Sequence, residues 1–143
     1  MLKIVIEYAI KRPAVMIAVP HAFLVDDEEI VRGSLGRLLR AIGVPNTGFA
    51  SAEAFLTGYS GAPGCLIVDI RMPGMSGLDL LEELQRRGIT LPAIVITGHT
   101  DEPSLQRLSA LRIVGLLEKP FSTAQLKEML ARIPADPRHG GAR

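Results

Sequence analysis

Residues 24–29 read LVDDEE, so that a short apolar run ends at four consecutive acids. Acids at the start of a helix face the positive end of the helix dipole, which stabilises them by about 0.3–1 kcal/mol. A cluster of carboxylates directly behind a buried strand could also hold a cation. The remainder of the chain decides between these two interpretations, because a cation site needs partners from other segments.

Short apolar runs recur after residue 21, at positions 22–25, 65–68, 93–96 and 113–117. They do not alternate with polar residues, although Gly115 interrupts the last one. Continuous runs of this length are typical of strands that are buried on both faces of a sheet. A weaker run at 47–50 predicts one more strand.

Segments with helical periodicity separate these runs. Apolar residues recur at helical spacing in four stretches, at positions 30–42, 52–56, 78–84 and 105–111. Ser51 stands before the second stretch as a candidate N-cap, and Ser122 with Gln125 has the spacing of a capping box before a helix that reaches Ile133. Strand and helix thus alternate along the chain, which predicts an α/β domain with a parallel sheet covered by helices on both faces.

Composition narrows the class of function. The 143 residues fit one domain with a net charge of +1, and the basic residues are too scattered to form a stripe for nucleic acid. No apolar stretch approaches the roughly 20 residues that a membrane span requires. The single cysteine, Cys65, lies in an apolar run and is expected to be a buried thiol in a reducing compartment. We therefore expect a cytoplasmic location, no direct DNA binding and no membrane partner.

The two ends of the chain differ in character from the region between them. Residues 1–20 fit a strand by their alternation of apolar and polar positions, and a helical pattern fits nearly as well. One interpretation, which we favour, is that the gene start is misassigned and that translation begins at Met16. The other is that these residues add a strand for docking or dimerisation. Residues 134–143, PADPRHGGAR, are rich in Pro and Gly and are expected to be disordered. This length leaves no room for a DNA-binding domain, so we expect a non-covalent output.

Polar residues follow the apolar runs at the points where strands are expected to end. Asp26 and Asp27 follow the first run, Asp69 follows the run at 65–68, Thr97 the run at 93–96, and Lys119 the last run. In open parallel sheets, ligands bind outside the carboxyl ends of the strands, at the point where the strand order reverses. These side chains are therefore expected to meet at one edge of the sheet.

Converging carboxylates need a compensating charge. Two of them about 4 Å apart repel each other by about 4 kcal/mol at an effective dielectric constant of about 20. Magnesium suits such a site, because it takes one or two carboxylates and fills its other positions with water and phosphate oxygens. An Asp carboxylate can attack phosphorus as a nucleophile. Lys119 could then neutralise one phosphoryl oxygen, and Thr97 could donate a hydrogen bond to another.

Four stretches, LVDDEE, VDIRMPGMSG, VITGHTDEP and LLEKPF, closely resemble in order and spacing the receiver domain of bacterial two-component response regulators. The resemblance extends over residues 21–133 and is strongest to receivers that precede a helix-turn-helix output domain in longer proteins. It implies the CheY-like, flavodoxin-like (βα)5 fold, a doubly wound parallel sheet of five strands in the order 2-1-3-4-5. It also favours a cation site as the role of the acids in LVDDEE.

The resemblance implies the ligands of that cation. Asp27 and Asp69 would ligate Mg²⁺ directly, together with the backbone carbonyl of Arg71. Asp26 would act through a bound water molecule. Mn²⁺ is an alternative ion for the same ligands.

For the reaction, the resemblance implies that Asp69 accepts a phosphoryl group from a phosphohistidine of a sensor histidine kinase or a histidine phosphotransfer protein. Thr97 and Lys119 would contact the phosphoryl oxygens, and the peptide bond from Lys119 to Pro120 would be cis. Arg71 and His99 occupy positions that tune, in this family, how long the aspartyl phosphate survives.

Two positions depart from the family pattern. Leu116 stands where most receivers have a Tyr or Phe whose ring moves inward when Thr97 reaches toward the phosphoryl group, so we expect this switch to be weakened or replaced. Arg112 stands where relatives have a Gly that ends the fourth helix, and Arg enters a left-handed turn only at a cost. We therefore expect that helix to end differently.

Two classes of function remain open. We expect a signalling module that is not an enzyme: a single-domain response regulator that changes its binding to a downstream protein when phosphorylated. It would be a monomer or a weak homodimer through the face formed by the fourth helix, the fifth strand and the fifth helix. A phosphate sink and a receiver uncoupled from phosphorylation are alternatives within this class.

The second class is a phosphatase with an aspartyl nucleophile, as in the haloacid dehalogenases. Those enzymes carry a second Asp, two residues after the nucleophile, as a general acid. Arg71 occupies that place here, and a guanidinium cannot donate a proton at any useful pH. The signalling class is therefore favoured.

Overall fold

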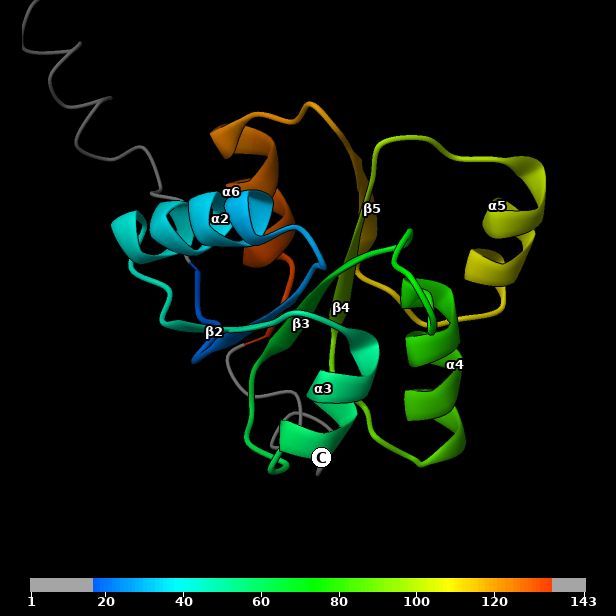
Figure 1. The fold of residues 1–143 in the computed structure, drawn as a ribbon. Helices are drawn as coiled ribbons and strands as arrows, with labels where there is room; N and C mark the ends of the chain where they lie inside the picture. Colours follow the sequence, from blue (N-terminus) through cyan, green and yellow to red (C-terminus); the bar gives the residue numbers. More distant parts are fainter. Residues whose placement is uncertain (1–16, 135–143) are drawn as a thin grey trace, which may run out of the picture.

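A parallel sheet of five strands runs through the centre of residues 17–134, the part of the chain that the computed structural model describes (Figure 1). The strands are β1 Ala22–Val25, β2 Asn46–Phe49, β3 Cys65–Asp69, β4 Ala93–Thr97 and β5 Gly115–Glu118. Their order across the sheet is β2-β1-β3-β4-β5, and every neighbouring pair is parallel. The predicted fold class and strand order are therefore confirmed.

Some of the predictions concern residues beyond this range. A strand, a helix or a misassigned start was considered for the amino-terminal extension, and disorder was predicted for the carboxyl-terminal tail; residues 1–16 and 135–143 fall outside the described residues. Between residues 17 and 134, no helix is long and apolar enough to cross a membrane.

Helices cover both faces of the sheet, because alternate residues of each strand point to opposite sides. The helices are α2 Glu29–Ala41, α3 Ala52–Gly58, α4 Gly77–Arg86, α5 Glu102–Ser109 and α6 Thr123–Ala131. α2 and α6 pack on one face, over a core that includes Leu24 and Ile67. α3, α4 and α5 pack on the other face, over a core that includes Phe23 and Leu66.

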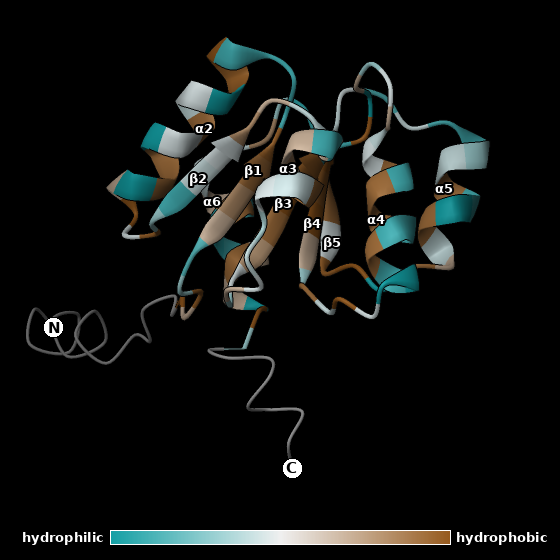
Figure 2. Ribbon diagram, turned by 60° about the horizontal axis from the view of Figure 1, so that its bottom comes forward, coloured by the Kyte–Doolittle hydropathy of each residue, from teal (hydrophilic) through white to brown (hydrophobic). Residues whose placement is uncertain are grey.

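Position in the sheet explains the strength of the strand signals. Every residue of β1, β3 and β4 is buried, which accounts for their continuous apolar runs (Figure 2). The two edge strands are partly exposed, with Thr47 and Gly48 facing solvent in β2 and Glu118 in β5. Their predicted bounds were accordingly the least accurate: β2 begins one residue earlier than expected, at Asn46, and β5 begins only at Gly115.

Capping groups define several helix ends. The Ser122 hydroxyl oxygen accepts from the N–H of Gln125 at 3.1 Å, and Gln125 Oε1 accepts from the N–H of Ser122 at 2.8 Å, which confirms the predicted capping box. α5 ends at Ser109 with Ala110 as a right-handed C-cap, and no non-glycine residue between 17 and 134 has a positive φ. Arg112 therefore avoids the left-handed conformation. This agrees with the expectation that the helix ends differently from helices that end at a left-handed Gly.

Gly77 brings the end of β3 against the start of α4. Its N–H donates to the carbonyl oxygen of Ile70 at 2.8 Å, and a Cβ at this position would collide with the carbonyl oxygen of Asp69. The carbonyl oxygen of Asp69 belongs to the backbone, so it could move away from an added Cβ only if the strand or the helix shifted. This contact holds the backbone that carries Asp69.

We predict that Gly77→Ala lowers the free energy of unfolding by about 1–3 kcal/mol, because the added methyl group has no space. Gly33→Ala in α2 is the matched control, since a Cβ there would have its nearest neighbour, Arg37 Nη1, at 3.5 Å. The gain in helix propensity should make that variant more stable by about 0.5–1 kcal/mol. Urea unfolding followed by circular dichroism measures both effects, and a Gly77→Ala variant as stable as the unchanged protein would contradict this packing.

Cys65 offers a second test of the core. Its side chain is 0% exposed, and burial raises the pKa of its thiol to about 12. Because the thiolate is the reactive species, we predict no reaction with an aromatic disulfide reagent under native conditions at neutral pH. The same thiol should react completely in denaturant. Fast modification of the native protein would mean that β3 is accessible to solvent.

Candidate functional site

The predicted site residues gather at the carboxyl edge of the sheet. Asp69 and Thr97 are the last residues of β3 and β4, while Asp26 and Lys119 directly follow β1 and β5. The strand order reverses direction between β1 and β3, where sheets of this kind bind ligands. Asp26, Asp69 and Thr97 are buried, so their polar groups need partners within the domain or from a ligand.

Three carboxylates form the centre of this edge. Oxygens of Asp26, Glu28 and Asp69 all lie within 4.8 Å of one another. Glu28 was not among the predicted ligands, although its signal is visible in LVDDEE as an acid two residues after Asp26. Asp27 is exposed and lies outside this group, so its role as a direct ligand remains a prediction.

Backbone donors hold the two buried acids in place. The N–H of Glu28 donates to Asp26 Oδ1 at 2.9 Å, and the N–H of Arg71 donates to Asp69 Oδ1 at 3.1 Å. Each acid therefore accepts a bond from the residue two positions later, a local turn that Asp favours. Arg32 also donates from Nη1 to the carbonyl oxygen of Asp26 at 2.7 Å, which links α2 to the end of β1.

One lysine partly balances the negative charge. Lys119 Nζ lies 3.1 Å from Asp69 Oδ2 and 3.9 Å from Asp26 Oδ2, and the Lys119–Pro120 peptide bond is cis as expected. Burial raises the pKa of the Asp26 carboxyl, and the charge of Asp69 raises it further, while the bond from the Glu28 backbone opposes both effects. The buried carboxylate of Asp26 is therefore held at an electrostatic cost.

The donor set fits a hard divalent cation. Three carboxylates against one ammonium leave an excess of negative charge, and carboxylate oxygens are the ligands that Mg²⁺ and Mn²⁺ prefer. Such an ion would offset the burial of the Asp26 carboxylate, the main cause of its raised pKa, and also its repulsion from Asp69.

The Thr97 hydroxyl makes its hydrogen bonds with the backbone of His99. It donates to the carbonyl oxygen of His99 at 2.8 Å and accepts from the N–H of His99 at 3.2 Å. The hydroxyl is thus satisfied within its own loop, and a contact with a phosphoryl group would require it to leave these partners. His99 is exposed and, within residues 17–134, does not belong to the group formed by Asp26, Glu28 and Asp69.

The loop after Asp69 is held from both sides. On one side, Glu53 of α3 accepts from the N–H of Met75 at 3.2 Å. On the other, Arg71 Nη2 lies 3.7 Å from Asp101 Oδ2, at the start of α5. The Arg71 side chain therefore points toward α5, so that the residue meets the acidic site through its backbone.

Comparison with known proteins identifies the family to which this chain belongs. Residues 22–131 match the family model described as the response regulator receiver domain. The chain belongs to this family. The match covers the whole receiver sheet and all five described helices.

Relatives of this receiver domain include transcriptional regulators. The transcriptional regulatory protein FixJ of Azorhizobium caulinodans is 44% identical over 106 residues, which make up 72% of this chain and 49% of that protein. Nodulation protein W of Bradyrhizobium diazoefficiens is 40% identical over 105 residues, 73% of this chain and 46% of that protein. The chain therefore spans about half the length of these curated relatives.

Solved structures agree with this assignment. The crystal structure of FixJ-N has a TM-score of 0.73 and 40% identity, and the match covers 79% of this chain and 91% of that one. The response regulator StyR has a TM-score of 0.77 and 34% identity, over 87% of this chain and 64% of that one.

We predict that Asp26→Asn weakens Mg²⁺ binding at least tenfold, about 1.4 kcal/mol, because the site loses one negative charge. Without metal, the variant should be no less stable than the unchanged protein, since a buried charge beside Asp69 is removed and Asn can still accept from Glu28. Thermal unfolding at increasing Mg²⁺ concentration measures both effects. Glu128→Gln, which removes an exposed acid of α6, is the control, and equal metal responses of both variants would contradict the assigned site.

Proposed function

We propose that this receiver domain accepts a phosphoryl group on Asp69 from a phosphohistidine of a sensor histidine kinase or a histidine phosphotransfer protein, in a magnesium-dependent reaction in the cytoplasm. The observation that carries the proposal is the setting of the Asp69 carboxylate. One oxygen is held by the Arg71 backbone, and the other lies 3.1 Å from Lys119 inside a group of three carboxylates. The chain itself would then be a phosphoprotein rather than an enzyme with its own turnover.

The roles of the residues follow from this setting. A carboxylate oxygen of Asp69 attacks the phosphorus, the P–N bond of the phosphohistidine breaks, and the leaving imidazole takes up a proton. Lys119 is close enough to Asp69 to transfer its ion pair to a phosphoryl oxygen. Thr97 would rotate from the backbone of His99 to donate to another phosphoryl oxygen. When bound, Mg²⁺ would neutralise charge on the transferred group. Asp69, Asp27 and the backbone carbonyl of Arg71 would be direct ligands, with Asp26 acting through water, and Glu28 is close enough to Asp26 and Asp69 to contribute a further oxygen.

The output would be a change in protein–protein contacts. In the labels of Figure 1, the face expected to signal is formed by α5, β5 and α6. Leu105 of α5 is 42% exposed, so this face offers an apolar contact point. A weak phosphorylation-dependent homodimer or a downstream protein would use it. The proposal concerns the receiver domain and holds equally for a domain that acts alone and for one joined to an output domain.

Leu116 is the observation that favours a second candidate, a receiver whose output is uncoupled from phosphorylation or that serves as a phosphate sink. Its side chain is half-buried and packs against the core beneath α3, α4 and α5. A Leu there fills less space than an aromatic ring, so a movement of Thr97 would be transmitted less directly. The phosphatase remains disfavoured, because Arg71 pairs with Asp101 and no acid stands two residues after Asp69.

Intact mass tests the phosphoacceptor. After incubation with acetyl phosphate and Mg²⁺, the protein should gain the mass of one phosphoryl group. The adduct should be absent from Asp69→Asn, which keeps the shape but loses the nucleophile, and from a sample without metal. An adduct of equal yield on Asp69→Asn would place the phosphoryl group elsewhere.

Leu116→Tyr tests the output. An aromatic ring at this position should couple the movement of Thr97 to β5 more strongly, and phosphorylation-dependent self-association should rise at least several-fold. Sedimentation velocity of phosphorylated and unphosphorylated samples measures this association. If the monomer–dimer equilibrium is the same in both variants, the signal passes through other residues.

A further inference from the structure

Helix α5 has little apolar attachment to the domain. It buries a single residue, Leu108, whereas the neighbouring α4 buries five. One buried Leu contributes about 1.5–3 kcal/mol, which is little for a whole helix. Polar contacts must therefore make up much of what holds α5 in place.

The principal polar contact is made by Arg107. Its Nη2 atom donates to Asp79 Oδ1 at 2.8 Å and to Glu82 Oε1 at 2.6 Å, and its Nε atom donates to Glu82 Oε2 at 3.1 Å. Asp79 is itself fixed, because it forms the capping box of α4 with Ser76. The guanidinium thus binds two acids of α4. Bidentate pairs of this kind are stronger and more directional than ion pairs with a single hydrogen bond.

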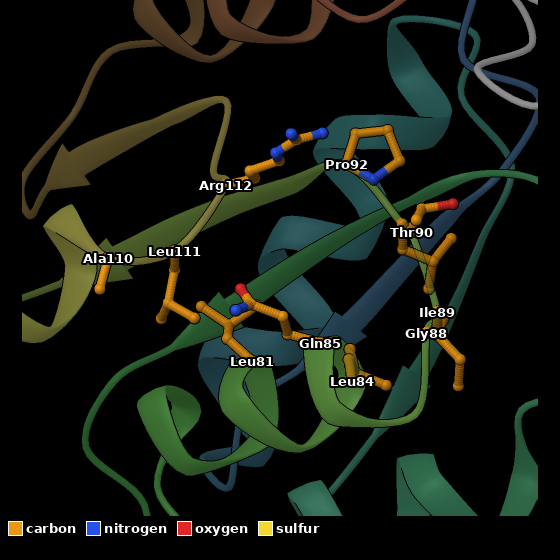
Figure 3. Close-up of a pocket in the computed structure, with 11 residues that line it drawn as sticks. Leu81, Leu84, Gln85, Gly88, Ile89, Thr90, Pro92, Ala110, Leu111 and Arg112 are labelled. Carbon is orange, nitrogen blue, oxygen red and sulfur yellow. The ribbon is translucent and has the colours of Figure 1, made fainter. Parts of the chain in front are cut away.

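A cavity of about 530 Å³ lies close to this bridge, because Arg107 is in the last turn of α5. It is lined by the last turns of α4, the loop at 88–92 and the segment that directly follows α5. Figure 3 shows Leu81 and Leu84 of α4 on one side of it and Leu111 and Arg112 on the other. An unfilled space offers few packing contacts to oppose a displacement, so the end of α5 has room to shift when Arg107 leaves its two acids.

The start of α5 is connected to the phosphoacceptor. Asp101 caps the helix through Oδ1, which accepts from the N–H of Ser104 at 2.8 Å. Its other oxygen faces Arg71 at 3.7 Å, and Arg71 is bound through its backbone to Asp69. A phosphoryl group on Asp69 carries about 1.5–2 negative charges in place of the single charge of the carboxylate. This is more than the single charge of Asp101, and it competes for the same guanidinium.

We infer that Arg107 is a positioning residue that ties α5 to α4 in the unphosphorylated domain, and that the Arg71–Asp101 pair transmits the charge on Asp69 to this helix. When the ion pair between Arg71 and Asp101 breaks, the first turn of α5 becomes looser. The bridge from Arg107 to Asp79 and Glu82 then still holds α5 to α4. The part played by Asp69 rests on the proposed function, whereas the bridge between the helices does not.

Hydrogen exchange of the full chain tests the tether, read by mass spectrometry on peptides from α5. In the unphosphorylated protein, Arg107→Gln should raise exchange in α5 about threefold, within the range expected for exposed ion pairs, and leave the sheet unchanged. Arg86→Gln is the matched control, since Arg86 pairs with Glu83 inside α4 and bridges no other helix. Equal exchange in α5 for all three proteins would overturn the tether, and circular dichroism verifies that each is folded.

Asp101→Asn tests the connection to Asp69. Asn retains the capping oxygen but loses the charge that pairs with Arg71. With acetyl phosphate and Mg²⁺, exchange in α5 should rise in the unchanged protein, and this rise should be at least halved in Asp101→Asn at equal phosphorylation. An equal rise in both proteins would overturn the connection. Intact mass on the same samples separates the two levels: no adduct would overturn the proposed function and this connection, while the Arg107→Gln result still decides the tether.

Discussion

The contact between Lys119 and Asp69, at 3.1 Å, is the interaction on which the site depends. It joins the ends of β3 and β5, two strands that are separated by β4 in the sheet. Among residues 17–134 it places one ammonium in the acidic group, beside the residue that would react. One ammonium cannot balance three carboxylates. Burial, and to a smaller extent the charge of Asp69, raises the pKa of Asp26. The site is therefore built to receive positive charge and to lose its lysine to an incoming anion, two requirements that a phosphoryl group with its metal meets together.

Much of the fold was predictable, because β1, β3 and β4 are buried on both faces and therefore appear in the sequence as continuous apolar runs. The edge strands leave a weaker signal, and their bounds were misjudged by one or two residues. The convergence of Asp26, Asp69 and Lys119 followed from strand polarity alone. Glu28 was missed because its place in the group depends on how the chain turns after β1, which no periodicity reports. For the same reason, the present orientation of Thr97 toward His99 was not predictable.

The two helix layers of this receiver domain are held by different forces. α2 and α6 share a core with the sheet that includes Leu39 and Leu130, both fully buried. On the opposite face, the attachment weakens from α4 to α5, where side chains 28 positions apart, Asp79 and Arg107, replace apolar packing. Such long-range polar pairs have no signature in sequence spacing. They are also easier to break than a core, because their alternative partner is water, and this gives one face of the domain its capacity to change while the sheet stays fixed.

The placement of Cys65 has a consequence for the environment in which the domain can work. The chain has one cysteine, and it lies at the start of the strand that ends in Asp69, fully buried and with a raised pKa. Oxidants and electrophiles act on exposed thiolates, so the strand that carries the phosphoacceptor presents nothing for them to modify. The strand that ends in Asp69 is therefore insulated from thiol oxidation, and this insulation depends on the packing of one small side chain.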